Sequence, residues 1–190
     1  GYGVFATALI PRGTIVYVKD SLEQEFTPGS FAAHSPEMQT VIEKYSYIDE
    51  RGVRILSWDF AKYVNHCCRF NTVSTGYGFK IAIQDISPGE EITDDYALFN
   101  LEYGMPLVCS RPECRGLVSS RDFDRLVPEW DRLITEVLPQ ALDIDQPLLQ
   151  FLDPDTRQAL ELYCREGSGY RSVRRLKRPA ADLGVAPRIA

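Results

Sequence analysis

The sequence divides into a long first part of short strand-like segments and a second part with helical periodicity, and this division constrains the fold most strongly. Over residues 1–117, segments rich in branched and aromatic residues, such as 14–18, alternate with turn signals. Residues 79–84 alternate between apolar residues and others such as Lys80, as a half-buried strand does. From Trp130 onward, apolar residues recur at spacings of three and four, which is typical of an amphipathic helix. We expect a mainly β domain with a C-terminal helical extension, α+β overall.

Turn and capping residues mark where the expected elements begin and end. Residues 11–13 (Pro-Arg-Gly) and 87–90 (Ser-Pro-Gly-Glu) have the residue types of tight turns. Residues 45–57 read as a hairpin with Glu-Arg-Gly at its tip. Two sites combine a capping side chain with a following proline, Ser35-Pro36 and Asp153-Pro154, and each predicts the start of a helix.

The charge of the chain is distributed unevenly. The net charge is −6, from 21 basic and 27 acidic residues, and 44% hydrophobic residues are typical of a globular protein. Residues 171–190 carry six positive charges and one negative, so residues 1–170 hold 15 positive and 26 negative. An acidic body argues against a general nucleic-acid binder and favours a basic partner. We expect the basic tail to be loose and solubilising; nucleic-acid contact by residues 171–190 is the less favoured alternative.

Cysteine count and hydropathy bear on where the protein works. Five cysteines are an odd number, which suits a reducing intracellular compartment, cytoplasm or nucleus, better than a disulfide framework. No apolar stretch approaches the roughly 20 residues of a membrane helix, so no membrane partner is expected. The chain begins at Gly1 without a methionine, and we interpret it as a fragment that lacks at least one upstream strand.

Three short segments are rich in residues that bind ligands or carry chemistry. Residues 1–5 contain two glycines, which let a backbone approach a ligand closely, although a simple strand-edge turn would have the same composition. Residues 63–71 hold two Asn, one His and two Cys, and the alternative interpretation is a satisfied polar turn. Residues 89–96 form an acidic segment that ends in a tyrosine, and the alternative there is a solvated edge strand.

Taken in order, these segments resemble the SET domain, the β-rich family of S-adenosylmethionine-dependent protein-lysine methyltransferases. Residues 1–3 look like its G-x-G, residues 65–71 like its N-H-x-C-x-x-N, and residues 89–96 like its G-E-E-L-T-x-D-Y. Residues 109–116 are similar to the C-x4-C-R-G end of a post-SET zinc motif. The resemblance covers about residues 1–117, is closest to bacterial members, and implies several small sheets with a threaded, knot-like C-terminal segment.

The resemblance implies roles for particular residues at the cofactor. The backbone of Gly1, Tyr2 and Gly3 would hold the methionine part of S-adenosylmethionine. Asn65 and His66 would take the adenosine side, in a segment threaded through a C-terminal loop.

It also implies a catalytic residue and a channel. Tyr96 would be the catalytic tyrosine, and the substrate lysine would enter from the face opposite the cofactor. Candidates for the channel wall include Tyr63, Phe99 and Asp94. Asp94 stands where the family often has Phe or Tyr, so its carboxylate would hold a lysine as the ammonium ion, unless it points to solvent.

A zinc site is implied less completely. Three cysteines match the post-SET pattern, namely Cys68, Cys109 and Cys114. Leu107 replaces the fourth, and structural zinc is almost always four-coordinate. Cys67 or Cys164 could substitute, but we favour a site without zinc.

The expected organisation is a SET domain over residues 1–117, a helical extension over 118–168 and a basic flexible tail over 169–190. The expected function is methyl transfer from S-adenosylmethionine to a lysine side chain in a basic protein, such as a histone-like tail. The alternative is a non-catalytic SET-like module that binds a basic partner.

Overall fold

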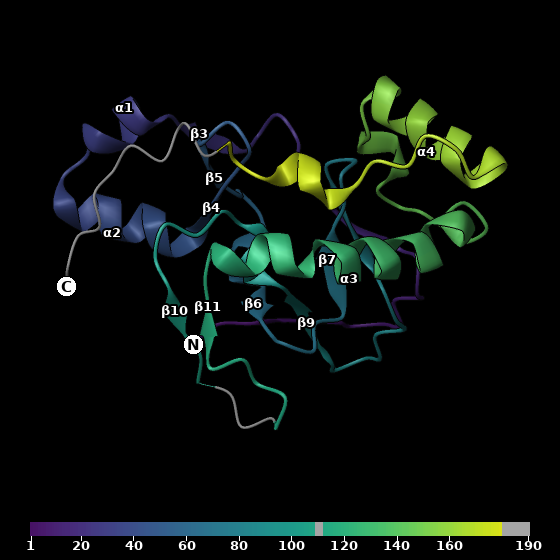
Figure 1. Ribbon diagram of the computed structural model, residues 1–190, viewed down its shortest axis with the longest axis horizontal. Helices are drawn as coiled ribbons and strands as arrows, with labels where there is room; N and C mark the ends of the chain where they lie inside the picture. The colour runs from purple at the N-terminus through teal and green to yellow at the C-terminus, as the bar shows by residue number, and fades with distance from the viewer. Residues whose placement is uncertain (109–111, 180–190) are drawn as a thin grey trace.

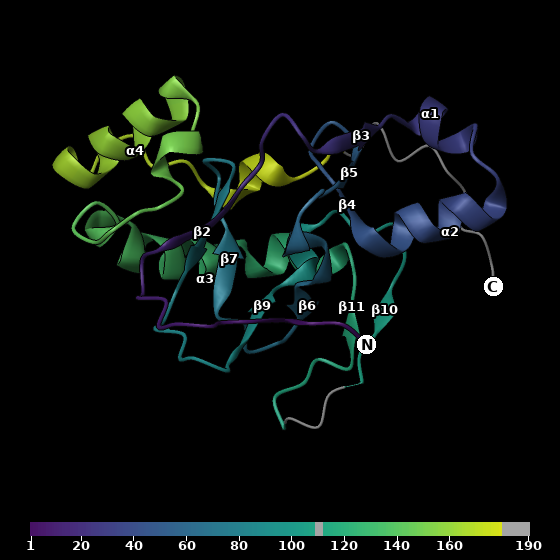
Figure 2. The ribbon, with the colours of Figure 1, turned by 180° about the vertical axis from the view of Figure 1, so that it is seen from behind.

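Small sheets fill the space between helices in the computed structural model, which describes residues 1–108 and 112–179 (Figure 1). In these residues there are three three-stranded sheets and one two-stranded sheet. Helices α1 and α2 lie at one end, α4 lies at the other, and α3 runs along the middle. Seen from behind, β2 and β7 lie in front of α3 (Figure 2). The predicted mixed α+β architecture is confirmed.

The first sheet has the order β2-β8-β7, with β2 at Ile15–Val18, β7 at Thr72–Ser74 and β8 at Phe79–Ala82. Both pairings are antiparallel. Ile81 is completely buried, as the alternating pattern requires. The prediction of a half-buried strand is only partly confirmed, because on its second face the Lys80 side chain is just 13% exposed and Ala82 is fully buried. This strand therefore packs on both faces.

The second sheet contains the predicted hairpin. Its order is β3-β5-β4, with β3 at Gln24–Phe26, β4 at Ser46–Ile48 and β5 at Arg54–Leu56. The hairpin prediction is confirmed, because β4 and β5 pair antiparallel around a turn in which Gly52 has a φ of 75°. Helices α1 (Pro28–Ala32) and α2 (Pro36–Tyr45) precede it. Ser35 caps α2 by accepting a hydrogen bond from the Met38 amide, as predicted.

The third sheet places the acidic segment in its centre. Its order is β1-β9-β6, with β1 at Val4–Phe5, β6 at Asn65–His66 and β9 at Glu91–Asp94. Strand β9 pairs antiparallel with β1 and parallel with β6, so the alternative of a solvated edge strand is wrong. The Asn71 side chain donates to the Glu91 carbonyl and accepts from the Thr93 amide, both at 2.8 Å. This side chain holds the 63–71 segment against β9.

The helical part completes the core. Strands β10 (Met105–Pro106) and β11 (Leu117–Val118) pair antiparallel and lead into α3 (Arg121–Val137) and then α4 (Pro154–Glu166). Between α3 and α4 lie the short 3₁₀ turns η3 (Leu138–Gln140) and η4 (Leu149–Phe151), and earlier in the chain lie η1 (Phe60–Tyr63) and η2 (Tyr96–Leu98). Trp130 and Ile134 of α3 pack in the same cluster as Val73 and Ile81. No described helix is long and apolar enough to span a membrane.

The start of the basic tail is packed against the body. The Asp131 carboxylate of α3 accepts hydrogen bonds from Tyr170 Oη at 2.7 Å, Ser172 Oγ at 2.6 Å and the Val173 amide at 2.9 Å. The turn η5 (Val173–Leu176) begins with Val173, which is fully buried. The expectation of a loose tail from residue 169 is therefore wrong for this segment; residues 180–190 lie outside the described part.

Replacing Asp131 by Ala should detach this segment, since the carboxylate accepts three hydrogen bonds. Because hydrogen bonds to charged groups contribute about 1.5–3 kcal/mol each, we expect the free energy of unfolding to fall by about 2–4 kcal/mol in urea denaturation. The matched control is Asp145→Ala at an exposed position, which should change it by less than about 0.5 kcal/mol. Equal effects of the two variants would contradict the anchoring role.

Candidate functional site

Tyr96 stands between two cavities of different character. The larger, which we call the aromatic cavity, has a volume of about 500 Å³. The smaller, which we call the Asn65 cavity, has about 270 Å³ and is bounded by residues 65–68, Tyr96 and residues 105–108. Tyr96 lines both, together with Met105 and Pro106. The two cavities therefore meet at these three residues, of which Tyr96 has the polar side chain.

The backbone around Tyr96 fixes the position of its ring. Strand β9 ends at Asp94 and η2 begins at Tyr96. The Tyr96 amide donates to His66 Nδ1 at 3.2 Å, and Tyr96 Oη donates to the Val64 carbonyl at 2.6 Å. Burial raises the pKa of Tyr96 to about 12, with the Asp94 carboxylate acting in the same direction. The hydroxyl therefore stays protonated at neutral pH and remains a hydrogen-bond donor.

The neighbouring carboxylate, Asp95, joins three distant segments to this strand. It is 1% exposed, and its Oδ1 accepts from Arg115 Nη2 at 2.6 Å and from the Ala97 amide at 3.1 Å. Its Oδ2 accepts from Trp130 Nε1 of α3 at 3.2 Å. His66 Nδ1 lies 3.7 Å from the same carboxylate. The loop before β11 and helix α3 are thus fixed to the end of β9.

His66 is held as the neutral tautomer. Its Nδ1 accepts the Tyr96 amide hydrogen, so the ring proton sits on Nε2, which lies 3.5 Å from Cys68 Sγ. Burial lowers the pKa of His66, opposed by the Asp95 carboxylate and assisted by the Arg115 charge. A neutral imidazole here supports the backbone of Tyr96 and lines the Asn65 cavity.

The residues expected at a cofactor lie together beside the Asn65 cavity. Asn65 Nδ2 donates to the Tyr2 carbonyl and to Glu91 Oε1, both at 2.8 Å. A Cβ atom on Gly3 would lie 2.6 Å from Glu91 Oε1, so only glycine fits without displacement. Gly1 has open space around it, and both views place the N-terminus near β10 and β11 (Figures 1 and 2). Hydrogen bonds thus connect Asn65 to Tyr2 and Glu91, and the cofactor roles of the expected residues stay predictions.

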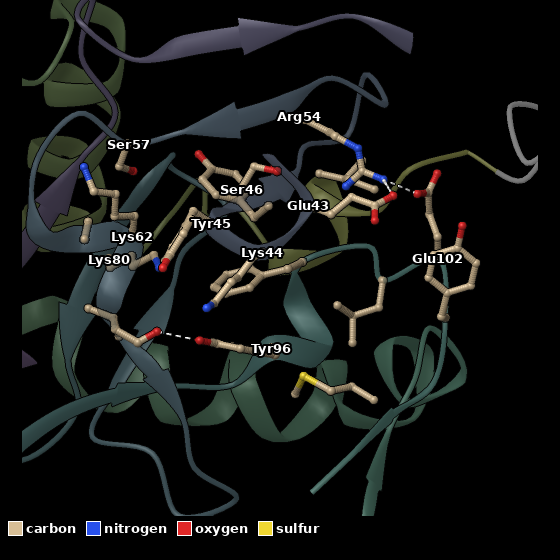
Figure 3. Close-up of a pocket in the computed structure, with 18 of the residues that line it drawn as sticks. Glu43, Lys44, Tyr45, Ser46, Arg54, Ser57, Lys62, Lys80, Tyr96 and Glu102 are labelled. Atoms are coloured by element: carbon tan, nitrogen blue, oxygen red, sulfur yellow. Dashed lines mark hydrogen bonds and ion pairs between the residues drawn. The ribbon is translucent and has the colours of Figure 1, made fainter. Parts of the chain in front are cut away.

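The aromatic cavity is lined by five aromatic residues besides Tyr96: Tyr17, Tyr45, Tyr47, Phe99 and Tyr103. Figure 3 shows Lys80 and Tyr96 towards one end of the cavity, with Arg54 and Glu102 at the other. Arg54 forms ion pairs there with Glu102 and, at 3.5 Å, with Glu43. The cavity thus combines an aromatic end with a charged end.

The three residues expected in the channel wall lie at different depths. Phe99 lines the aromatic cavity, and its ring centroid is 5.2 Å from that of Tyr96. Tyr63 lies behind the wall, with its ring 5.6 Å from that of Tyr45 and 5.4 Å from that of Tyr2. Asp94 is completely buried, so the alternative that it points to solvent is wrong.

Sequence reasoning missed the cations that pair with the two buried carboxylates. Lys80 Nζ lies 2.7 Å from Asp94 Oδ2, and Arg115 pairs with Asp95. Two consecutive aspartates in a segment that becomes buried indicate that two cations must lie nearby, because an unpaired buried charge is costly. Their identity could not be read, since Lys80 is 14 positions away and Arg115 is 20.

The described residues do not fit a structural zinc ion. Of the post-SET positions, Cys68 and Cys114 are described, Leu107 offers no ligand atom and Cys109 lies outside the described residues. Within the described ranges, no group of three His, Cys, Asp or Glu side chains could hold a metal. Cys68 Sγ instead accepts a hydrogen bond from the Arg115 amide at 3.4 Å. The expectation about zinc stays a prediction, and no chemistry below depends on a metal.

Comparison with known proteins gives one family match. The family model of the SET domain matches residues 1–97, just over half of the chain. No curated protein matches the chain.

Solved structures with detectable similarity share little identity with this chain. The methyltransferase domain of human histone-lysine N-methyltransferase SETMAR is 18% identical with a TM-score of 0.42, covering 63% of this chain and 54% of that one. A candidate histone methyltransferase of Plasmodium falciparum is 16% identical, with a TM-score of 0.37 and coverage of 50% and 82%. A humanized mutant of the Chaetomium thermophilum Polycomb Repressive Complex 2, bound to an inhibitor, is 15% identical, with a TM-score of 0.36 and coverage of 90% and 24%. The chain thus spans about half the length of the first of these.

Replacing Asp95 by Asn should destabilise the fold, because the mostly buried Arg115 would lose its counter-charge. We expect the free energy of unfolding to fall by about 3–5 kcal/mol in urea denaturation, since breaking a buried pair leaves one charge uncompensated. The double variant Asp95→Asn, Arg115→Met should recover part of this loss. Glu161→Gln, which breaks an exposed pair with Arg157, is the control and should cost less than about 1 kcal/mol. Additive losses in the double variant would argue against the pairing.

Proposed function

The chain belongs to the SET-domain family, and on that premise we propose that it transfers a methyl group from S-adenosylmethionine to the side-chain amine of a lysine in a basic protein. The observation that carries this proposal is the position of Tyr96 between the aromatic cavity and the Asn65 cavity. A donor in one cavity and an acceptor in the other would meet beside its hydroxyl.

The Asn65 cavity has the features that the donor requires. A Cβ atom on Gly3 would lie 2.6 Å from Glu91 Oε1, so the glycine lets this carboxylate lie against the N-terminal segment, next to the Asn65 side chain that lines the cavity. A carboxylate there suits a ligand that carries positive charge. When bound, S-adenosylmethionine would supply a methyl group on a sulfonium, which an amine takes by in-line displacement while the C–S electron pair stays on sulfur. Asn65 orients the Tyr2 carbonyl at the edge of this site.

The aromatic cavity suits an acceptor amine that must become neutral. Deprotonating a lysine of pKa about 10.4 at pH 7.4 costs about 4 kcal/mol, at roughly 1.36 kcal/mol per pH unit. Aromatic walls such as Tyr45, Tyr47 and Phe99 desolvate the ammonium form and so lower this cost. The long aliphatic part of a lysine fits an apolar passage of this kind, and its proton leaves through the open end to water.

Tyr96 contributes alignment. Its hydroxyl is protonated and held at the Val64 carbonyl, so it offers a fixed polar atom at the junction without adding a negative charge. In-line displacement needs the two reactants held in one line, and such orientation supplies on the order of 7–11 kcal/mol. The rigid backbone around Tyr96, tied through His66 and Asp95, serves this purpose.

The charge distribution favours a basic protein as substrate. Residues 1–179, which include the packed start of the tail, hold 26 acidic and 20 basic residues, so the folded body keeps a net negative charge that attracts a segment rich in lysine and arginine. Long-range attraction of this kind raises the rate of encounter rather than selecting a sequence. A histone-like tail or another basic protein is the substrate class that this charge supports.

Replacing Tyr96 by Phe should reduce methyl transfer at least about a hundredfold, as removal of a positioned polar group at a reacting centre commonly does. The measurement is transfer of labelled methyl groups from S-adenosylmethionine to a panel of basic proteins. Tyr163→Phe removes the same hydroxyl from a buried tyrosine of the helical core and is the control; it should keep wild-type transfer. Equal labelling by Tyr96→Phe and wild type would contradict the role of Tyr96.

Replacing Gly3 by Ala should weaken S-adenosylmethionine binding at least about tenfold in isothermal titration calorimetry, because the new Cβ would displace Glu91. Gly29→Ala, where a Cβ meets nothing within 4 Å, is the control and should bind as the wild type does. The absence of binding heat with the wild-type chain would instead support the alternative of a non-catalytic binding module.

A further inference from the structure

A lysine of the chain itself lies in the wall of the aromatic cavity. Lys80 of β8 reaches this cavity and also a side cavity of about 240 Å³, which shares Tyr17, Tyr47 and Phe99 with it. Lys80 Nζ lies 4.6 Å from the ring centroid of Phe99 and 5.4 Å from that of Tyr17. A cation is thus built into the compartment proposed to receive a cationic substrate side chain.

The ion pair of Lys80 with Asp94 has a definite orientation. Asp94 is 0% exposed and lines none of the three cavities described above, whereas Lys80 lines two of them. The positive end of the pair therefore faces the aromatic cavity, and the negative end lies behind it. Burial raises the pKa of Asp94, and the ammonium of Lys80 opposes that rise. Asp94 acts on the cavity only through the lysine that it holds.

Other charged and titratable groups share the two cavities that Lys80 lines. In the side cavity, Lys19 pairs with Glu25, Arg51 pairs with Glu25 and Asp49, and Glu50 lines the same wall. The hydroxyls of Tyr17, Tyr47 and Tyr96 come from three other elements, and burial raises the pKa of each, so all three are neutral. Of the other charged side chains in the same wall, Lys62 donates to the Trp58 carbonyl at 3.3 Å.

The remaining charged side chains around the aromatic cavity have partners of their own. Glu23 is bonded to the far side of the Tyr17 hydroxyl at 2.7 Å, and Asp95 is paired with Arg115. Glu43, Arg54 and Glu102 pair with one another at the opposite end of the cavity, and Lys44 lies over the Tyr45 ring. Lys80 is the cation that lies beside the Phe99 and Tyr17 rings at the aromatic end.

We propose that Lys80 places a fixed positive charge beside the acceptor amine and thereby selects the neutral, nucleophilic form of the substrate lysine. A like charge disfavours the ammonium ion, and a cation held on a buried carboxylate cannot move away from it. The proton leaves the substrate for water before transfer; the amine lone pair then forms the N–C bond. This inference rests on the proposed function. It reverses the role that the sequence suggested for Asp94, whose carboxylate already holds an ammonium ion of the chain.

The test is the pH dependence of kcat/KM for methyl transfer. Lys80→Met removes the charge, so the acidic limb of the profile should move up by about one pH unit, and transfer at pH 7 should fall about tenfold while transfer at pH 9.5 stays near the wild-type value. Lys80→Arg keeps the charge and should keep the limb within about 0.3 units of the wild type. The double variant Lys80→Met, Asp94→Leu leaves no buried charge unpaired, and its limb should also lie above that of the wild type.

The control is Lys177→Met, which breaks a lysine–aspartate pair with Asp124 at an exposed site and should leave the profile unchanged. An equal loss of transfer at every pH in both Lys80→Met and the double variant would assign Lys80 a structural role only and overturn the proposal. So would a limb that does not move in either variant. Absence of transfer by the wild-type chain on every basic protein would overturn the proposed function itself, and this inference with it.

Discussion

The buried carboxylate of Asp95 is the interaction on which the site depends. It accepts from Arg115 of the loop before β11, from Trp130 of α3 and from the backbone at the start of η2. A buried carboxylate is stable only when its oxygens are satisfied, so these partners must be in place before the strand can end where it does. The position of the next residue, Tyr96, follows from this requirement, and with it the separation of the two cavities.

Two adjacent carboxylates at the end of β9, Asp94 and Asp95, are paired with cations from different parts of the chain. Asp95 meets Arg115 from the C-terminal side, and Asp94 meets Lys80 from β8. The first pair fastens the loop before β11 to the end of β9, whereas the second puts charge into the aromatic cavity. Asp95 thus stabilises the fold, whereas its neighbour Asp94 holds the charge that lies in the cavity wall.

Features that depend on near neighbours were predicted well from the sequence. The caps at Ser35 and Asp153 and the hairpin tip at Gly52 all form as expected, because a cap or a turn needs only a few adjacent residues. Features that depend on residues far away in the sequence were predicted poorly. Lys80 was placed on a half-buried strand, whereas its side chain is 13% exposed. Residues 169–190 were expected to form a loose tail, whereas Asp131 holds Tyr170, Ser172 and Val173 by hydrogen bonds.

The order and spacing of the motifs, from the glycines at residues 1–3 to Tyr96, determined the family and the set of residues that gathers at the Asn65 cavity. The sequence by itself also determined that two adjacent carboxylates, Asp94 and Asp95, stand directly before Tyr96. Only the tertiary structure decided which cation each group meets and which way each pair points. Charge pairing in a buried site depends on distances across strands and helices, and the local sequence pattern contains no information about those distances.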